Sequence, residues 1–268
     1  MIAEWLTSLR MPYPRHIRAV GFHKELVALA YRYDRQQAHW QPHLQQTRDV
    51  IAAAMDRCPA KRTALVLGAG GLLDVPLARL CEQFARVHLV DVVFLPGTRR
   101  AAKRFDNCNL ITCDITGTLE PVFDLDSFAA LPRPVDPAAL SGIVPSLTLS
   151  VNMLSQLPLM PLDHLERRSN GQLNEDEPPL SRFCHDVVAH HLAWLKSLPG
   201  QVCLISDERR FLYRNDASMA EKSVGEEDAL FGNALPPGGE QWMWDVAPPG
   251  EQEKHLGIRH LVRGYADF

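Results

Sequence analysis

The sequence predicts an α/β protein built on a doubly wound, mostly parallel sheet of seven strands, with an antiparallel C-terminal hairpin and an N-terminal helical extension. Short, near-continuous apolar runs recur after residue 62, as strands covered on both faces require. Amphipathic segments of helical period alternate with these runs. The last two apolar runs alternate polar and apolar residues on either side of a turn-rich stretch, which is typical of an antiparallel pair.

Composition limits the class of protein. The chain has 268 residues, a formal net charge of −4 and six cysteines without a Cys-x-x-Cys pair. This charge gives no reason to expect nucleic acid as a partner, and no run of 18 apolar residues predicts a membrane span. Scattered cysteines are typical of free thiols in a reducing compartment, and the N-terminus lacks a secretory signal. We expect a cytoplasmic protein, and the sequence leaves its oligomeric state open.

Residues 1–60 are expected to form a helical extension or cap, and residues 61–268 the ligand-binding domain. Two helices are predicted in the extension, separated at 39–43 with Pro42 in the first turn of the second. An amphipathic helix must bury its apolar face against something. We hypothesise that residues 15–58 fold over the ligand crevice. The alternatives are a lateral face of the sheet and a dimer interface.

Seven strands are expected beyond the extension, with helices between them. The strands are expected at 63–67, 86–94, 108–114, 146–152, 201–206, 240–246 and 257–265. The helices are expected at about 77–84, 97–105 and 181–198. In such a sheet the ligand sits at the carboxyl ends of the strands, where strand order reverses. The crevice is therefore expected above Leu67, Asp91, Asp114 and Asn152.

A glycine turn follows the first strand directly and contains Gly68, Ala69 and Gly70. Glycine lets a backbone turn sharply and lets a ligand approach it closely. A dinucleotide fingerprint would need a further glycine where Leu73 stands and a helix N-terminus free for pyrophosphate. We expect Asp74 to be the N-cap of the next helix, where its carboxylate would repel a diphosphate. A ligand carrying ammonium and sulfonium groups, such as S-adenosylmethionine, would not be repelled.

Two further acids end strands on the ligand side. Asp91 can accept hydrogen bonds from both hydroxyls of a ribose, or it can be an ordinary residue at the end of a strand. Val92 can pack against an adenine face. Asp114 can bond the adenine amino group or can equally cap a turn.

Four segments occur in the order and at the spacing of the cofactor motifs of class I S-adenosylmethionine-dependent methyltransferases. These segments are LVLGAGG, VHLVDVV, LITCDITG and LTLSVNMLSQLP. Roughly residues 60–268 resemble that family, and the predicted terminal hairpin is similar to its sixth and seventh strands. The sequence departs from the family at Leu72, where a third glycine is usual, and at Val66, where an acid is frequent.

The resemblance implies a Rossmann-like sheet with Gly68, Gly70, Asp91 and Asp114 at the cofactor. It also implies that the segment after the fourth strand lines the methyl-transfer side, which nominates Asn152 and Ser155.

Other polar residues have less specific interpretations. Asp207, near the expected end of the fifth strand, can orient a substrate or act as a base, or can pair with a neighbouring arginine. His185, His190 and His191 share a helix without a convergent third ligand, so no metal is expected.

The leading hypothesis is an S-adenosylmethionine-dependent methyltransferase whose unidentified substrate is a small molecule or a protein, with a small molecule favoured. Two alternatives stay open. One is a non-catalytic nucleoside-binding protein of the same fold, and the other is an NAD(P)-dependent oxidoreductase. Methyl transfer needs mainly in-line positioning and removal of water, so the sequence need not carry a catalytic motif.

Overall fold

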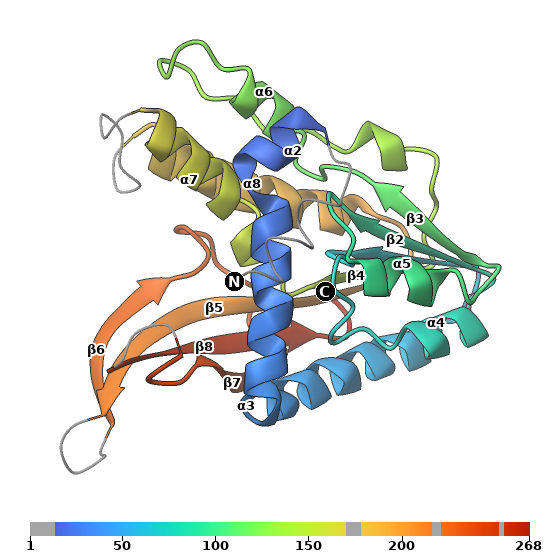
Figure 1. Cartoon of the computed structure of the whole chain (residues 1–268). Helices are drawn as coiled ribbons and strands as arrows, with labels where there is room; N and C mark the ends of the chain where they lie inside the picture. Colours follow the sequence, from blue (N-terminus) through green and yellow to red (C-terminus); the bar gives the residue numbers. More distant parts are fainter. Residues whose placement is uncertain (1–13, 170–177, 216–220, 252–254) are drawn as a thin grey trace.

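The computed structural model describes residues 14–169, 178–215, 221–251 and 255–268 (Figure 1). The first residues of the predicted extension, 1–13, lie outside this description. The strands described form one sheet, and their bounds are β1 Thr63–Leu67, β2 Arg86–Asp91, β3 Cys108–Thr112, β4 Leu147–Val151, β5 Gln201–Asn215, β6 Glu221–Asp228, β7 Glu240–Ala247 and β8 Leu256–Tyr265.

The sheet is doubly wound, as predicted. Its strand order is β3-β2-β1-β4-β5-β8-β7, and β6 pairs with β5 beside this path. The first five strands of the path are parallel, and β8 and β7 follow as an antiparallel pair. Strand order reverses between β1 and β4, both of which are buried along their whole length.

The fifth strand is longer than predicted, and the described part of the chain forms a sheet of eight strands rather than seven. The strand expected at 201–206 continues as β5 to Asn215, because β6 and β8 hydrogen-bond to its two edges. The β5–β8 register shifts between Asp207 and Arg209. Asp207 therefore lies within a strand at a bulge, a position that re-aims side chains.

Helices and short 3-10 turns connect and cover the strands. Their bounds are α2 Arg15–Val20, α3 Phe22–Arg57, α4 Leu77–Gln83, α5 Pro96–Ala102, α6 Leu119–Phe123, η1 Ala138–Leu140, η2 Leu154–Gln156, α7 Leu159–Arg168 and α8 Leu180–Ser197. None of the helices described is long and apolar enough to cross a membrane.

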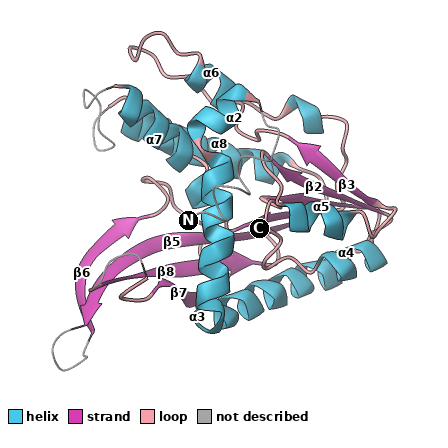
Figure 2. Cartoon of the chain, in the orientation of Figure 1, coloured by secondary structure: helices cyan, strands magenta, loops and turns pink. Residues whose placement is uncertain are grey.

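Both faces of the central strands β1 and β4 are buried, which explains their continuous apolar runs. Alternate residues of β1 point to opposite faces. Ala64 and Val66 join a core with the second half of α3, α4 and α5. Leu65 and Leu67 join a second core with α8. Figure 2 shows these helices packed along the strands.

The predicted break in the N-terminal helices is wrong in position. The residues described from Phe22 to Arg57 form one kinked helix, and the backbone leaves helical geometry at Gln36 rather than at 39–43. Near the kink, Arg35 and Gln36 bind the carboxylate of Glu251, with Nη2–Oε1 and Nε2–Oε2 distances of 2.6 Å each. Pro42 lies inside the second part of the helix.

The two parts of α3 pack on different surfaces. The second part lies along the sheet, where Trp40 and Leu44 contact Val246 and Ile258 of β7 and β8. The first part rises across the carboxyl ends of the strands, beside α2 (Figure 1). Here a separate apolar cluster joins α2 and α3 to the segment after β2, to α6 and to α7; its members are Ile17, Val20, Phe22, Leu26, Val92, Val93, Leu119 and Met160.

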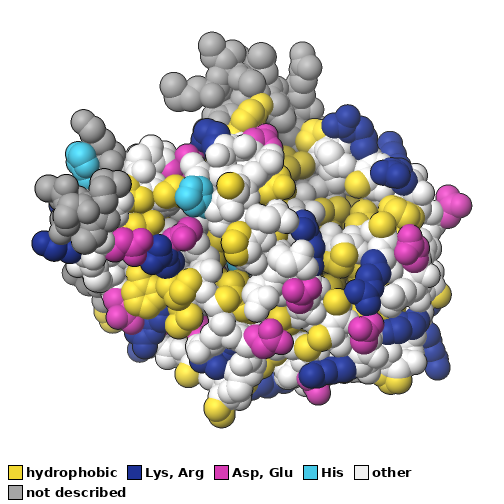
Figure 3. All heavy atoms as spheres, turned by 90° about the horizontal axis from the view of Figure 1, so that it is seen from below, with side chains coloured by type: hydrophobic (Ala, Val, Ile, Leu, Met, Phe, Trp, Pro, Cys, Tyr) yellow, Lys and Arg dark blue, Asp and Glu magenta, His cyan; other side chains and the backbone are white. Residues whose placement is uncertain are grey.

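The surface seen from below in Figure 3 presents acidic and basic side chains interspersed, without a broad field of one sign. This pattern is typical of a solvated face.

Candidate functional site

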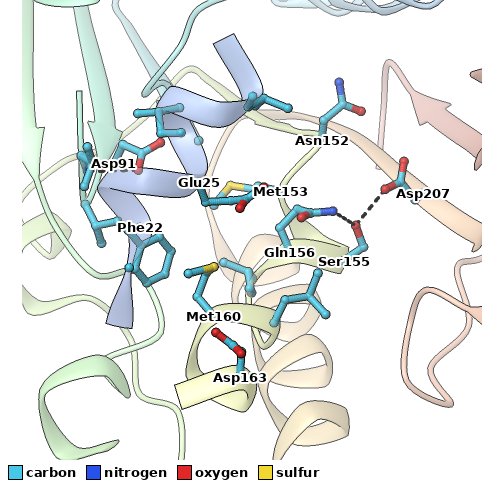
Figure 4. A pocket seen from close by; sticks show the side chains of 18 of the residues that line it. Phe22, Glu25, Asp91, Asn152, Met153, Ser155, Gln156, Met160, Asp163 and Asp207 are labelled. Atoms are coloured by element: carbon cyan, nitrogen blue, oxygen red, sulfur yellow. Dashed lines mark hydrogen bonds between the residues drawn. The ribbon is translucent and has the colours of Figure 1, made fainter. Parts of the chain in front are cut away.

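A cavity of about 1610 Å³ lies at the carboxyl ends of the parallel strands, beneath α2 and the first part of α3. It is larger than the roughly 300–1,000 Å³ typical of a pocket for one small ligand. The loops after β1 to β4, together with α7, β5 and β8, also contribute to its wall. In Figure 4, Asp91 and Asp207 lie on opposite sides of the view, with Met153 between them.

The glycine turn is tied directly to the acid at the end of β2. The amide of Gly70 donates a 2.8 Å hydrogen bond to Oδ2 of Asp91, and the amide of Val93 donates to Oδ1 over 3.3 Å. Burial raises the pKa of Asp91 to about 6, and the backbone hydrogen bonds oppose that rise. Oδ1 keeps acceptor capacity toward the cavity, because its one hydrogen bond is long.

The turn uses glycine mainly for the protein's own packing. A Cβ on Gly70 would lie 2.6 Å from the carbonyl oxygen of Val93 and 2.9 Å from Asp91 Oδ2. Gly68 has a φ of +77°, and its Cβ would meet Met153 at 3.2 Å. Glycine is therefore required at both positions before any ligand is considered.

Among the residues described, three non-glycine residues that line the cavity adopt left-handed backbone angles: Leu72, Asn152 and Phe231. Leu72, where the resemblance places a third glycine, has a φ of 52°, and so does Asn152 after β4. A side chain in this region costs roughly 1–2 kcal/mol. Such strain is concentrated at binding sites in many proteins.

Asp74 is not the N-cap of a helix, so that prediction is wrong. Helix α4 begins at Leu77, its N-cap is Pro76, and no side chain caps it. The Asp74 carboxylate instead accepts a 2.6 Å hydrogen bond from Nδ2 of Asn152, and both residues line the cavity. Burial raises the pKa of Asp74, and the Asn152 hydrogen bond opposes this rise.

Asn152 is the junction of a buried polar chain. Its Nδ2 also lies 3.1 Å from Nε2 of His43, whose Nδ1 accepts a 3.0 Å hydrogen bond from Trp242 Nε1. His43 stacks on Trp244 with ring centroids 4.0 Å apart. Burial lowers the pKa of His43 to about 4, so the imidazole is neutral at pH 7. The Oδ1 atom of Asn152 is buried and has no hydrogen-bond partner among the residues described.

Asp114 adopts the turn-capping role. Its Oδ1 accepts hydrogen bonds from the amide and hydroxyl of Thr116 over 2.9 and 2.7 Å, and its Oδ2 accepts from the amide of Leu119 over 2.9 Å. These bonds shape the loop between β3 and α6. Asp114 still lines the cavity.

Ser155 and Asp207 meet on the other side of the cavity. The Ser155 hydroxyl donates a 3.0 Å hydrogen bond to Oδ2 of Asp207 and accepts one of 3.2 Å from Gln156 Nε2 (Figure 4). Asp207 is 2% exposed, and its Oδ1 has no hydrogen-bond partner within the described part of the chain. The neighbouring His260 and His43 and the Ser155 hydrogen bond outweigh burial and lower the pKa of Asp207.

Most of the residues nominated from the sequence line this one cavity. They are Gly68, Asp74, Asp91, Val92, Asp114, Asn152, Ser155 and Asp207. Ala69 and Gly70 do not line it: Ala69 is fully buried and donates its amide to Val90, while Gly70 holds Asp91.

The sequence did not nominate three residues that shape the site. Leu26 of α3 contacts the glycine turn, and its side chain lies 3.0 Å from the place of a Gly70 Cβ. His43 and His260 reach the cavity from α3 and β8. The signal that could have found His260 is its place in the last predicted strand, 257–265.

No group of three or more His, Cys, Asp or Glu side chains suited to a metal ion occurs in the parts of the chain described. Of the three histidines on α8, His191 is buried and its Nε2 lies 3.0 Å from the Ser150 hydroxyl.

No protein-family model matches the chain. No curated protein matches it either. Solved structures do. A Burkholderia thailandensis 1,6-didemethyltoxoflavin-N1-methyltransferase with bound S-adenosylhomocysteine is 16% identical, with 94% of this chain and 91% of that chain covered and a TM-score of 0.37.

Two further structures give similar results. A DhpI complex with S-adenosylhomocysteine is 12% identical, covers 88% of this chain and 93% of its own, and has a TM-score of 0.32. An amino pentose methyltransferase from Micromonospora echinaspora is 13% identical, covers 82% and 91%, and has a TM-score of 0.26. At these identities and scores the likenesses assign no function to this chain. Its own strand order, with the antiparallel C-terminal pair, defines a doubly wound, Rossmann-like sheet.

Proposed function

We propose that this protein is an S-adenosylmethionine-dependent methyltransferase that acts on a small molecule. The observation that carries the proposal is the pairing of two polar sites in one cavity. The Gly70–Asp91 unit lies on one side of it and the Ser155–Asp207 pair on the other. A two-substrate reaction needs this arrangement, with one ligand held against the other.

The nucleoside fits the first side. Asp91 would accept hydrogen bonds from the ribose hydroxyls through Oδ1, which has capacity left. Val92 would lie against the adenine, and Gly68 would let the ligand approach the backbone. The Asp74 carboxylate, held in place by its hydrogen bond from Asn152, would attract the ammonium group of the methionine part. Ala69 and Gly70 would act indirectly by holding the shape of the turn.

The acceptor fits the second side. The cavity is larger than one ligand needs, and its further part is lined by Ser155, Asp207 and β8. Bound S-adenosylmethionine supplies an electrophilic methyl group on sulfur. The protein's part is to orient the acceptor and exclude water, and the cover formed by α2 and the first part of α3 suits the latter. This cover also favours a small molecule over a protein segment as acceptor.

A dinucleotide fits the site less well. Helix α4 has seven residues and begins only after Pro76, so it offers no long helix N-terminus at the glycine turn for a pyrophosphate. Asp74 and Asp91 bring two carboxylates to this side of the cavity. Their negative charge opposes a diphosphate and favours a cation.

Calorimetric titration with S-adenosylhomocysteine and with NAD tests the proposal. We expect S-adenosylhomocysteine to bind and to raise the melting temperature, because it stabilises the native state by mass action. NAD should do neither. Absence of S-adenosylhomocysteine binding at millimolar concentration, or preferential binding of NAD, would overturn it.

Binding alone does not separate an enzyme from a nucleoside-binding protein of the same fold. Transfer of a labelled methyl group from S-adenosylmethionine to the small-molecule fraction of a cell extract separates them. We expect label to appear in an organic product only when the protein is present.

A further inference from the structure

A buried carboxylate and an imidazole lie together on the acceptor side of the cavity. Nδ1 of His260 lies 2.9 Å from Oδ2 of Asp207. The contact is bent, since it does not meet the geometry of a linear hydrogen bond. Nδ1 is nevertheless enclosed, and no other acceptor bonds it among the residues described, so Asp207 is the acceptor within its reach.

The other ring nitrogen of His260, Nε2, has different surroundings from Nδ1. His260 lines the cavity and 12% of its side chain is exposed, while its Nδ1 is inaccessible. Nε2 has no hydrogen-bond partner among the residues described. When a carboxylate accepts a hydrogen bond from Nδ1–H, the single proton of the neutral ring stays on Nδ1, and Nε2 is then a free base.

Four side chains from three elements of the described chain surround His260. Asp207 and Arg210 face it from β5, Trp244 packs edge-on against it from β7, and His43 approaches from α3. His43 cannot take the same role. Its Nδ1 accepts a hydrogen bond from Trp242, and its Nε2 is in contact with Asn152.

We propose, on the basis of the proposed methyl transfer, that His260 is the base that removes a proton from the acceptor and that Asp207 is its positioning residue. The acceptor class that follows is a small molecule whose nucleophilic atom bears a proton, a hydroxyl or an N–H group. Ser155 keeps Asp207 in place through its 3.0 Å hydrogen bond.

The step balances as written. The lone pair of the acceptor oxygen or nitrogen forms the bond to the methyl carbon, and the electron pair of the carbon–sulfur bond stays with sulfur, which becomes neutral. The acceptor proton passes to Nε2 of His260. The Asp207 carboxylate stabilises the imidazolium, which then releases the proton to water.

The tautomer of His260 tests the geometry without any substrate. Nitrogen-15 correlation spectra of the whole protein, at a pH where the ring is neutral, should show the proton on Nδ1 and none on Nε2. In Asp207→Asn the population should move toward the Nε2–H form. A wild-type ring with its proton on Nε2 would overturn the proposal, whether or not the variant folds.

Diethyl pyrocarbonate, which acylates unprotonated imidazole nitrogen, tests whether Nε2 is free. Peptide mass spectrometry should find His260 modified, with the rate at least about tenfold lower in Asp207→Asn. Fully buried His191 is the internal control. Modification of His260 no faster than that of His191 would show a merely structural pair and overturn the proposal.

Titration with S-adenosylhomocysteine separates the two proposals. His260→Gln should bind it within about twofold of the wild-type affinity, because His260 lies with Asp207 on the acceptor side. Loss of binding in this variant would place His260 at the nucleoside and contradict its role as base. Absence of binding in the wild-type protein would overturn the proposed function itself, while the tautomer result would stand.

Discussion

The amide of Gly70 donates a hydrogen bond of 2.8 Å to Oδ2 of Asp91, so the turn after β1 and the acid after β2 form one unit. Two motifs that are separate in the sequence thus depend on one another. Any change that displaces the turn also displaces the carboxylate.

Gly70→Ala should disrupt this unit. The new Cβ would lie 2.6 Å from the Val93 carbonyl oxygen, so either the turn or the segment after β2 must move. We expect a loss of about 1–3 kcal/mol in the free energy of unfolding, as for overpacked sites. The affinity for S-adenosylhomocysteine should fall at least tenfold. Urea unfolding and calorimetry measure the two effects.

Gly71→Ala is the matched control. Its Cβ would meet Leu26 and Leu73 at 3.7 Å, which is ordinary contact. Equal effects of the two substitutions would show that the Gly70–Asp91 hydrogen bond does not position the site.

Asp91→Asn should separate stability from binding. The folded pKa of about 6 is above the ordinary 3.8, so the folded state holds more protons between these values and stability falls as pH rises through them. The amide variant should lack this fall, so its free energy of unfolding relative to wild type should be higher at pH 7.5 than at pH 4. Binding of S-adenosylhomocysteine should weaken by about 1.5–3 kcal/mol. Unchanged affinity for S-adenosylhomocysteine in a folded variant would show that the ribose does not bind at Asp91.

His191 should contribute the opposite pH dependence. Burial lowers its pKa from 6.5 to about 3, so the unfolded state binds more protons between these values. Its contribution to stability is present above pH 6.5 and is lost as pH falls. His191→Leu should reduce the loss of stability between pH 7 and pH 4.5 by about 3 kcal/mol.

Chemical denaturation at several pH values measures this effect. His190→Gln, on the same helix but with a partly exposed side chain, is the control. The prediction is wrong if both variants keep the slope of the wild-type protein.

Hydrogen exchange tests the cover over the cavity. With S-adenosylhomocysteine bound, residues 15–33 should gain protection together with the turn at Gly68, because both line the cavity. Residues 44–57 should change little, since they already pack on the sheet. Protection confined to the turn and to the loops at Asp91 and Asp114 would show that α2 and α3 do not cover the bound ligand.

Strands and strand-end acids could be predicted because their signals are local. Each apolar run of the parallel sheet is followed within a few residues by a residue that lines the cavity. The sheet order then brings Asp91 and Asn152 to one edge. Even so, the local pattern did not decide whether Asp114 caps a turn, which depends on the amides of Thr116 and Leu119.

Features that depend on distant partners could not be predicted. The kink at Gln36 coincides with contacts to Glu251, more than two hundred residues away. The length of β5 depends on β6, whose residues showed no clear apolar alternation. Asp74 is a residue type that favours the N-cap position. Its carboxylate instead accepts a hydrogen bond from Asn152, and the helix begins at Leu77.

Leu72 holds the backbone angle that glycine adopts freely, although it is not glycine. The shape of the turn is therefore imposed by its surroundings, and the residue accepts it at some cost. A comparison made letter by letter counts this position as a mismatch, whereas a comparison of dihedral angles counts it as a match. For proteins of this kind, torsion profiles of the turn should detect distant kinship that residue patterns overlook.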